Sequence, residues 1–269
     1  MGLPVPFSAI QRLPLAKRNK ITSTAMAALH LTASRSCRGR IQANLVVVPA
    51  ANSEQFERFC ELNKGTCPLL YHSKPGEVTA ASLAIDTDIR TLLPSYFVLK
   101  NGQQDSRAAD LKQFPWSDMV SFYIRSISSH IEQELLASGI PVQSTEQKRA
   151  VSQYKTNIQC TGVPPFNCPL VVCMHPIPQQ LLERTVAVTL RLGGLYGAPI
   201  HIGDPSVIGI RDINRPDYGD PSDMDGCVPM FWPSSLTSHL AIKSAGEFIL
   251  AFCSVQETRT RTPKAVAWE

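Results

Sequence analysis

The first 53 residues of this 269-residue chain contain no aspartate or glutamate. The same stretch carries seven lysines and arginines and is rich in serine and threonine. A segment that is basic, hydroxyl-rich and free of acids is typical of a mitochondrial presequence. We therefore expect residues 1–40 to target the protein to the mitochondrial matrix, with a disordered basic tail as the alternative.

The acid-free segment also accounts for the positive charge of the chain. The net charge is +4, but seven positive charges lie within the first 40 residues, so the remainder carries a net charge of −3. A slightly acidic body has no electrostatic attraction for a phosphate backbone. The sequence therefore argues against nucleic acid as a partner.

Long apolar runs and several signature motifs are missing as well. No run approaches 18 consecutive apolar residues, which excludes a predicted membrane-spanning helix. The eight cysteines include no Cys-x-x-Cys pair, and no glycine-rich nucleotide loop or Gly-x-Ser-x-Gly elbow occurs. We therefore expect neither a metal nor a nucleotide cofactor, and cysteines that are mostly reduced and buried.

Short apolar runs alternate with helical periods along residues 41–253. We expect strands at residues 44–48, 67–71, 95–99, 169–174, 199–202 and 248–253. Helices are predicted after Asn52, over residues 116–127, from a Ser129-x-x-Glu132 capping box to Gly139, and after Pro178. These elements give two strand–helix–strand units, at residues 44–71 and 169–202. The second unit predicts a parallel pair of strands joined by a right-handed crossover. The predicted fold is α/β, a mixed sheet with helices on its faces, arranged as two intertwined α/β subdomains.

The predicted domain organisation follows from these patterns. Residues 1–40 form the presequence-like segment, residues 41–253 the α/β domain, and residues 254–269 a divergent, disordered tail. If the α/β domain has two subdomains, their boundary is expected near residues 140–155.

Three polar clusters fall at the edges of predicted strands. They are Lys155, Thr156, Asn157 and Cys160; His201 and Asp204; and Arg215, Asp217, Tyr218 and Asp220. Arg90 adds an exposed guanidinium, whose fork can bind a carboxylate at two atoms. An imidazole near hydroxyl, amide and basic groups suits a small anionic substrate and proton transfer. Each cluster also has a plainer explanation, namely a structural histidine, Asx turns or an inert buried thiol.

Several segments in a fixed order carry a family resemblance. They are Asp88-Ile-Arg90, Tyr154-Lys-Thr-Asn-Ile-Gln-Cys160, Pro169-Leu-Val-Val-Cys-Met-His-Pro-Ile-Pro178, Gly197-Ala-Pro-Ile-His-Ile-Gly-Asp-Pro205, Arg215-Pro-Asp-Tyr-Gly-Asp220 and Val228-Pro-Met-Phe-Trp232. Together they resemble the hydro-lyase family that includes the N-terminal region of mitochondrial D-glutamate cyclase. The likeness extends from about residue 41 to residue 253.

The resemblance implies a two-part α/β fold and a lyase that removes water from a small carboxylic or amino acid. In the cyclase, the amine of D-glutamate attacks the side-chain carboxyl group and gives 5-oxo-D-proline. On the matched positions we expect carboxylate binding by Arg90, Lys155, Thr156, Asn157 and Arg215, with His201 as general base or acid and Asp204 orienting it. A homo-oligomer is compatible with the sequence.

Several positions depart from the family pattern. Met174-His175-Pro176 stands where Met-Arg-Pro is expected, which removes a candidate carboxylate partner, and Cys168 replaces a glycine. A Gly-Cys-Ser-Phe run is replaced around residues 125–130. After Cys253 the family continues with a His-Ala-Pro-Gly-His-type segment, whereas this chain reads Ser-Val-Gln-Glu-Thr-Arg. The altered C-terminal segment predicts, as the alternative, a non-catalytic protein that binds a small acid or has a regulatory role.

Overall fold

The computed structural model describes residues 41–83, 85–93, 95–100, 103–192, 197–243, 245 and 248–255. Within these ranges the chain forms two antiparallel sheets with helices packed on them. The predicted targeting segment lies outside the described residues. So does the predicted tail, apart from Ser254 and Val255, which end the last strand.

The first sheet has six strands in the order β2-β5-β1-β10-β3-β4, and the second has four in the order β6-β7-β9-β8. The strands are β1 (Ile41–Pro49), β2 (Leu69–His72), β3 (Tyr96–Lys100), β4 (Gln103–Ala108), β5 (Met119–Arg125), β6 (Ser152–Gln159), β7 (Pro169–Pro178), β8 (His201–Ile202), β9 (Cys227–Pro233) and β10 (Phe248–Val255). The helices are α3 (Ser53–Leu62), α4 (Ile89–Leu92), α5 (Ile127–Ala137), α6 (Gln143–Glu146), α7 (Leu182–Leu190) and α8 (Leu236–Ile242), with a short 3-10 segment η5 (Pro205–Ile208).

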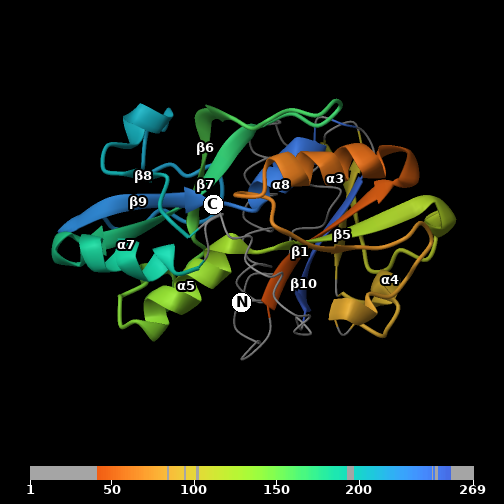
Figure 1. Cartoon of the computed structure of the whole chain (residues 1–269), viewed down its shortest axis with the longest axis horizontal. Coiled ribbons are helices and arrows are strands. Elements are labelled where there is room, and N and C mark those ends of the chain that lie inside the picture. Colours follow the sequence, from red (N-terminus) through yellow and green to blue (C-terminus); the bar gives the residue numbers. More distant parts are fainter. Residues whose placement is uncertain are drawn as a thin grey trace, which may run out of the picture.

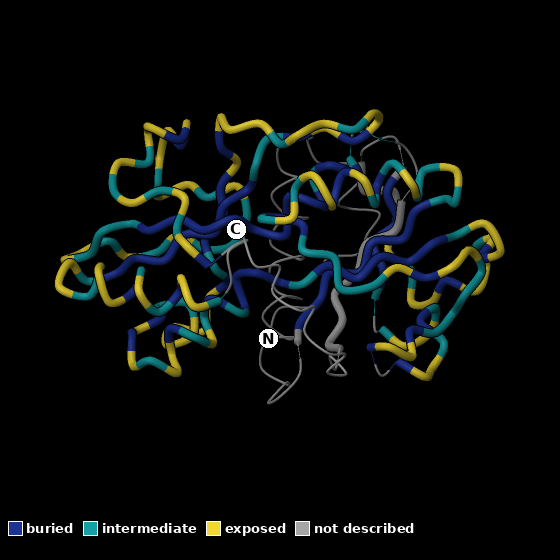
Figure 2. The backbone as a smooth tube through the Cα atoms, viewed as in Figure 1, coloured by how far each residue is buried: buried dark blue, intermediate teal, exposed yellow. Residues whose placement is uncertain are grey.

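The two sheets lie side by side along the long axis of the molecule (Figure 1). Apolar clusters cover both faces of each sheet: α3 and α8 pack on one face of the first, and α5 and α7 on one face of the second. Strands β1, β5 and β7 are accordingly mostly buried, and many of the exposed residues lie on the outer loops (Figure 2). None of the helices in the described ranges combines the length and apolarity that a bilayer crossing requires.

The α/β class is confirmed, but the predicted parallel pair is wrong. Every pairing between described strands is antiparallel. In each strand–helix–strand unit a later strand inserts between the two: β5 separates β1 from β2, and β9 separates β7 from β8. The outer strands of a unit therefore run in the same direction without being neighbours.

The two sheets are intertwined because the chain returns to the first after completing the second. β10 follows all four strands of the second sheet and inserts between β1 and β3. Helix α5 contacts both β1 and β9, and α8 contacts β7. The proposed boundary near residues 140–155 stays a prediction.

The predicted helix at residues 116–127 is wrong. After one 3-10 turn at Trp116–Asp118 these residues form β5, which lies between β2 and β1. Both faces of β5 are covered, with Phe122 in one core and Tyr123 in the other. A strand buried on both faces is a nearly continuous apolar run, and such a run can show helical spacing by chance.

The helix predicted after it is confirmed, but its capping box is wrong. Helix α5 begins at Ile127, so Ser129 lies inside the first turn. The Ser129 hydroxyl donates to Oε1 of Gln42 on β1 (3.0 Å), and Glu132 accepts a hydrogen bond from the Ser144 hydroxyl of α6. These side chains fix α5 against its neighbours and do not cap its N-terminus.

Glu132 makes stability depend on pH. Burial raises the pKa of its carboxyl from 4.5 to about 7, against a smaller opposing effect of the Ser144 hydrogen bond. The folded protein therefore holds this proton up to about pH 7, whereas the unfolded chain releases it near pH 4.5. The free energy of unfolding should fall as the pH rises through this window, by of the order of 2 kcal/mol.

Glu132→Gln should remove this fall, because the amide keeps the Ser144 contact and cannot ionise. Urea unfolding at pH 5 and pH 8 measures the effect, with Glu134→Gln on the same helix as the control. Equal pH dependence in wild type and Glu132→Gln would show that the carboxyl is solvated.

Hydroxyl and amide side chains are buried where the two sheets meet. Asn44 Nδ2 on β1 donates to Ser235 Oγ before α8 (2.8 Å), and Thr66 Oγ1 donates to the Ser234 carbonyl (2.8 Å). The Ser234 hydroxyl donates in turn to Gln153 on β6. Paired polar groups in a buried junction favour one arrangement of the sheets over others.

Candidate functional site

The segment at residues 215–220 runs along the outer edge of β6. Asp217 Oδ2 accepts a hydrogen bond from the main-chain N–H of Lys155 (2.9 Å). Asp220 Oδ2 accepts one from the N–H of Ala150 (2.9 Å). Edge strands expose such N–H groups unless something covers them. Both aspartates therefore have a structural role in closing the edge of the second sheet.

A cleft of about 370 Å³ lies between β6 and the loop that follows η5. Its walls are formed by Tyr154, Lys155, Gly209, Ile210, Arg211, Asp212, Arg215 and Asp217. Gly209 has a φ of +82°, and a Cβ there would lie 2.9 Å from the Cβ of Asn157. Glycine thus allows the loop to approach the strand, and the resulting volume suits a small ligand.

One ion pair lies in the cleft wall. Lys155 Nζ is 3.5 Å from Asp217 Oδ1 and lies over the ring of Tyr218, 5.7 Å from its centroid. Asp217 thus binds both the main chain and the side chain of Lys155. This pair is partly exposed, so its contribution to stability is small.

Two guanidiniums in the same wall are available to bind a ligand. Within the part of the chain that the structure describes, the side chains of Arg211 and Arg215 have no hydrogen-bond or ion-pair partner. Between them in the sequence, Asp212 Oδ1 accepts a hydrogen bond from the N–H of Asn214 (3.0 Å). Guanidiniums bind carboxylates with two parallel hydrogen bonds, so this wall can receive a carboxylate ligand.

Tyr154 forms part of the cleft wall and does not transfer protons near neutral pH. Its hydroxyl donates to the carbonyl of Ile213 (2.5 Å), which fixes the loop onto β6. Burial raises the pKa of this phenol to about 12. The group therefore stays protonated at pH 7.

Of the residues predicted on β6, the structure brings Lys155 to the cleft together with Arg215. Thr156 is buried, and its hydroxyl donates to the Leu170 carbonyl of β7 (2.9 Å). Asn157 lies against Gly209 beside the cleft. Neither Thr156 nor Asn157 lines its wall, so their expected contact with a carboxylate stays a prediction.

His201 lies on β8, which forms one edge of the four-stranded sheet, while β6 forms the opposite edge. Its Nε2 is 2.6 Å from the main-chain oxygen of Asp204, and its ring packs on Phe231 at 5.8 Å. A carbonyl can only accept, so Nε2 carries the proton and Nδ1 is left as the acceptor in the neutral ring. His201 is thus anchored at one end of the segment whose other end lines the cleft.

Asp204 orients His201 through its main chain, while its carboxylate has another role. Oδ1 accepts from the N–H of Ser206 (2.9 Å) and caps η5. Hydrogen bonds from Ser206 lower the pKa of this carboxyl, and the charge of His201 is a smaller cause. A catalytic dyad formed by the two side chains is therefore absent from the described structure.

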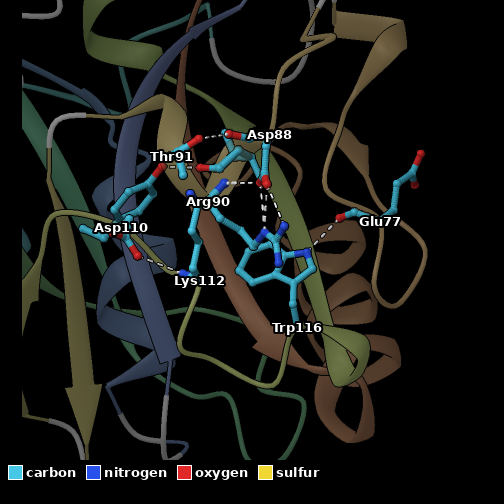
Figure 3. A network of polar contacts seen from close by, with 9 residues as sticks. Glu77, Asp88, Arg90, Thr91, Asp110, Lys112 and Trp116 are labelled. Atoms are coloured by element: carbon cyan, nitrogen blue, oxygen red, sulfur yellow. Dashed lines mark hydrogen bonds and ion pairs between the residues drawn. The ribbon is translucent and has the colours of Figure 1, made fainter.

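Arg90 lies on α4, near the opposite end of the molecule from β8 (Figure 1). Asp88 holds its guanidinium, with Nη2 2.6 Å from Oδ2 and Nε 2.9 Å from Oδ1 (Figure 3). The hydrogen bond from Arg90 lowers the pKa of Asp88, whose side chain also caps α4. Asp88 thus occupies the guanidinium of Arg90 that was predicted to bind the substrate. The structure does not bring Arg90 to the cleft.

His175 occupies the position where the family pattern has arginine. It is buried on β7 against Trp232, with ring centroids 5.7 Å apart. Burial lowers its pKa to about 4, so the ring is neutral at pH 7. His175 therefore supplies no cation to a carboxylate.

Sequence reasoning missed Gly209, Arg211 and Asp212. They lie between the quoted segments that end at Pro205 and begin at Arg215. The available signal was a glycine followed two residues later by adjacent opposite charges within an otherwise apolar run. That pattern predicts a turn equally well, and only the fold shows that it faces Lys155.

The family model described as D-glutamate cyclase matches residues 120–258. Among curated proteins, one named "Putative hydro-lyase" from Azorhizobium caulinodans is 40% identical over 215 residues, which cover 79% of each chain. A protein of the same name from Syntrophobacter fumaroxidans is 41% identical, over 76% of this chain and 78% of that one. A third, from Stutzerimonas stutzeri, is 38% identical over 79% and 80%.

The residues that the family model matches include β6, the loop with Arg211 and Arg215, and β9, which together form or support the cleft. The family model also spans β5 to β10, and so includes strands of both sheets. The resemblance first seen in short ordered segments is thus confirmed over more than half of the sequence, and the chain belongs to the D-glutamate cyclase family.

Proposed function

We propose that this chain is a hydro-lyase that closes D-glutamate to 5-oxo-D-proline in the cleft beside β6. The name of the relatives supports the reaction class, and the description of the family model supports the substrate. The observation that carries the proposal is the pair of uncommitted guanidiniums, Arg211 and Arg215, in one small cleft.

The charges of the cleft complement those of glutamate. Three cations and two carboxylates line it, and one cation, Lys155, is paired with Asp217. Glutamate at neutral pH carries two carboxylates and one ammonium. We assign its two carboxylates to Arg211 and Arg215 and its ammonium to Asp212, which leaves no charge of the ligand unmatched.

Ring closure forms a bond between the amine nitrogen and the side-chain carboxyl carbon and releases one water. Over the whole reaction the ammonium loses two protons, one before the nitrogen attacks and one as the amide forms, and the departing carboxylate oxygen gains two and leaves as water. Fixing both carboxylates holds the nitrogen and the carbon close together, which raises their effective concentration. Positioning is thus the contribution that Arg211, Asp212 and Arg215 make to the reaction.

An activity assay of the full chain with D- and L-glutamate tests this function. Mass spectrometry of 5-oxoproline should show product from the D-isomer only. Product from neither isomer, in a sample with cooperative thermal unfolding, would reject D-glutamate cyclisation. Calorimetric titration with D-glutamate then separates a wrong substrate, which does not bind, from a non-catalytic binding protein, which does.

The non-catalytic alternative has one specific observation in its favour. His175 is neutral and buried where the family pattern places arginine. His175→Arg should raise turnover if that cation is needed for catalysis. Unchanged turnover in a folded His175→Arg variant would show that residue 175 does not determine the activity.

His201 was predicted as a general base or acid, and its anchoring bond supports a positioning role. His201→Ala should lower kcat/KM because Asp204 and the segment leading to Arg211 lose their tether. His201→Gln should retain most of the rate and the same pH profile, because the glutamine amide can donate to the same carbonyl. Equal loss in both variants, with normal unfolding curves, would instead support proton transfer by the imidazole.

We further propose that the protein works in the mitochondrial matrix on its free small-acid substrate. The acid-free basic segment at residues 1–40 supports this location. Fusion of residues 1–40 to a fluorescent protein tests it, and a cytosolic distribution of the fusion would count against it.

A further inference from the structure

Two cysteines face each other where the β6–β7 ladder ends and the connecting loop begins. Gln159 pairs with Pro169, so Cys160 and Cys168 are the next residues outward, and the Cys160 N–H donates to the Cys168 carbonyl (3.1 Å). Opposed residues of an antiparallel ladder have Cα atoms about 4.5–5.5 Å apart. A disulfide spans about 4.4–6.8 Å between Cα atoms, so the backbone can accept this bond with little movement.

The two thiols are unequal. Cys160 is partly buried, whereas Cys168 is buried. The Cys168 thiol donates a hydrogen bond to the Cys160 sulfur, which lowers the pKa of Cys160 and raises that of Cys168. The more accessible sulfur is therefore also the one stabilised as thiolate, which is the form that reacts.

Two more free thiols, Cys60 and Cys67, lie buried in the same core. Burial and the neighbouring thiols, Cys60 first among them, raise the pKa of Cys67, so it is protected from reaction. Among the described residues, no group of three or more His, Cys, Asp or Glu is placed to hold a metal ion. The geometry thus favours a bond within one pair over a site shared by four thiols.

We propose that Cys160 and Cys168 form a reversible disulfide when the protein meets a hydroperoxide. The Cys160 thiolate attacks the peroxide oxygen, which gives a sulfenic acid at Cys160 and releases the alcohol or, from hydrogen peroxide, water. The Cys168 thiol then attacks the sulfenic sulfur, the S–S bond forms and one water leaves. The dithiol loses two electrons and the peroxide gains them; a thiol reductant reverses the step.

The two cysteines lie where the hairpin contacts α3, which packs on the first sheet. The connecting loop packs on α3, with the rings of Phe166 and Phe56 5.1 Å apart. Asn63 at the end of α3 donates to the Thr161 carbonyl and accepts from the Thr161 N–H, both at 2.9 Å. A disulfide at this position would close the hairpin at its contact with α3, five residues along β6 from Lys155 of the cleft.

Peptide mapping of the wild-type full chain tests the proposal without any substitution. Reduced protein is treated with hydrogen peroxide, alkylated and digested without reductant. The expected result is a linked Cys160–Cys168 peptide with a mass about 2 Da below the sum of its reduced parts, lost after dithiothreitol. No linked peptide, or a Cys160 link to Cys60 or Cys67, would overturn the assignment.

Matched serine variants assign the order of the two steps. Cys168→Ser should accumulate a dimedone-reactive sulfenic acid at Cys160, because the second thiol is missing. Cys160→Ser should leave Cys168 alkylated after the same treatment. Cys227→Ser, which removes a partly buried thiol at the start of β9, should leave the linked peptide unchanged. Sulfenic acid at Cys168 in place of Cys160 would overturn the proposed order.

Discussion

Replacing Arg211 or Arg215 with alanine should raise the KM for D-glutamate about 10- to 100-fold in each single variant. A hydrogen bond to a charged group contributes about 1.5–3 kcal/mol, and each variant removes the cation that holds one carboxylate. Neither guanidinium has a partner within the described residues, so the fold should not depend on it. Steady-state kinetics and thermal unfolding of the same samples measure the two effects.

Lysine and a distant arginine provide the controls. Arg211→Lys and Arg215→Lys keep the charge but lose the two-point fork, so we expect only partial recovery of KM. Arg191→Ala removes an exposed arginine at the end of α7, outside the cleft wall, and should leave KM unchanged. An unchanged KM in both alanine variants would mean that the substrate binds outside this cleft. If the wild-type protein binds D-glutamate without turnover, the Kd for D-glutamate is compared in place of KM.

The sequence predicted the strands whose apolar runs have clear ends. Residues 44–48 and 169–174 are apolar runs bounded by proline or polar residues, and both lie inside observed strands. β5, covered on both faces like β1, was missed because no proline or glycine separates it from α5, so the two together have the length of a helix. Strand order also failed, because insertion of β5 and β9 depends on partners more than 20 residues away.

The candidate site was predictable only in part, for a similar reason. Lys155 and Arg215 were recognised, but they are 60 positions apart and meet because residues 215–220 pair along β6. Arg90 looked equally suitable, yet Asp88 two residues away already occupies its guanidinium. Residue type indicates what a side chain can bind, whereas its local partner decides whether it is available.

Gly219→Ala should lower the free energy of unfolding by about 3–5 kcal/mol. Gly219 has a φ of +80°, and a Cβ there would lie 2.0 Å from the carbonyl oxygen of Val151. Left-handed backbone costs a non-glycine residue about 1–2 kcal/mol, and an overlap with main-chain atoms adds about 1–3 kcal/mol or more. The overlap can only be relieved by moving residues 215–220 off β6. Urea unfolding measures the loss.

Gly226→Ala is the matched control, because it separates the backbone strain from the overlap. Its φ is +64°, and a Cβ there would meet nothing within 4 Å, so only about 1–2 kcal/mol should be lost. The excess loss in Gly219→Ala reports the overlap with the main chain of Ala150 and Val151. Because Asp217 and Asp220 leave β6 with that segment, Gly219→Ala should also weaken glutamate binding under conditions where it stays folded. Equal losses in the two variants would mean that the loop at residue 219 moves freely and does not position Arg215.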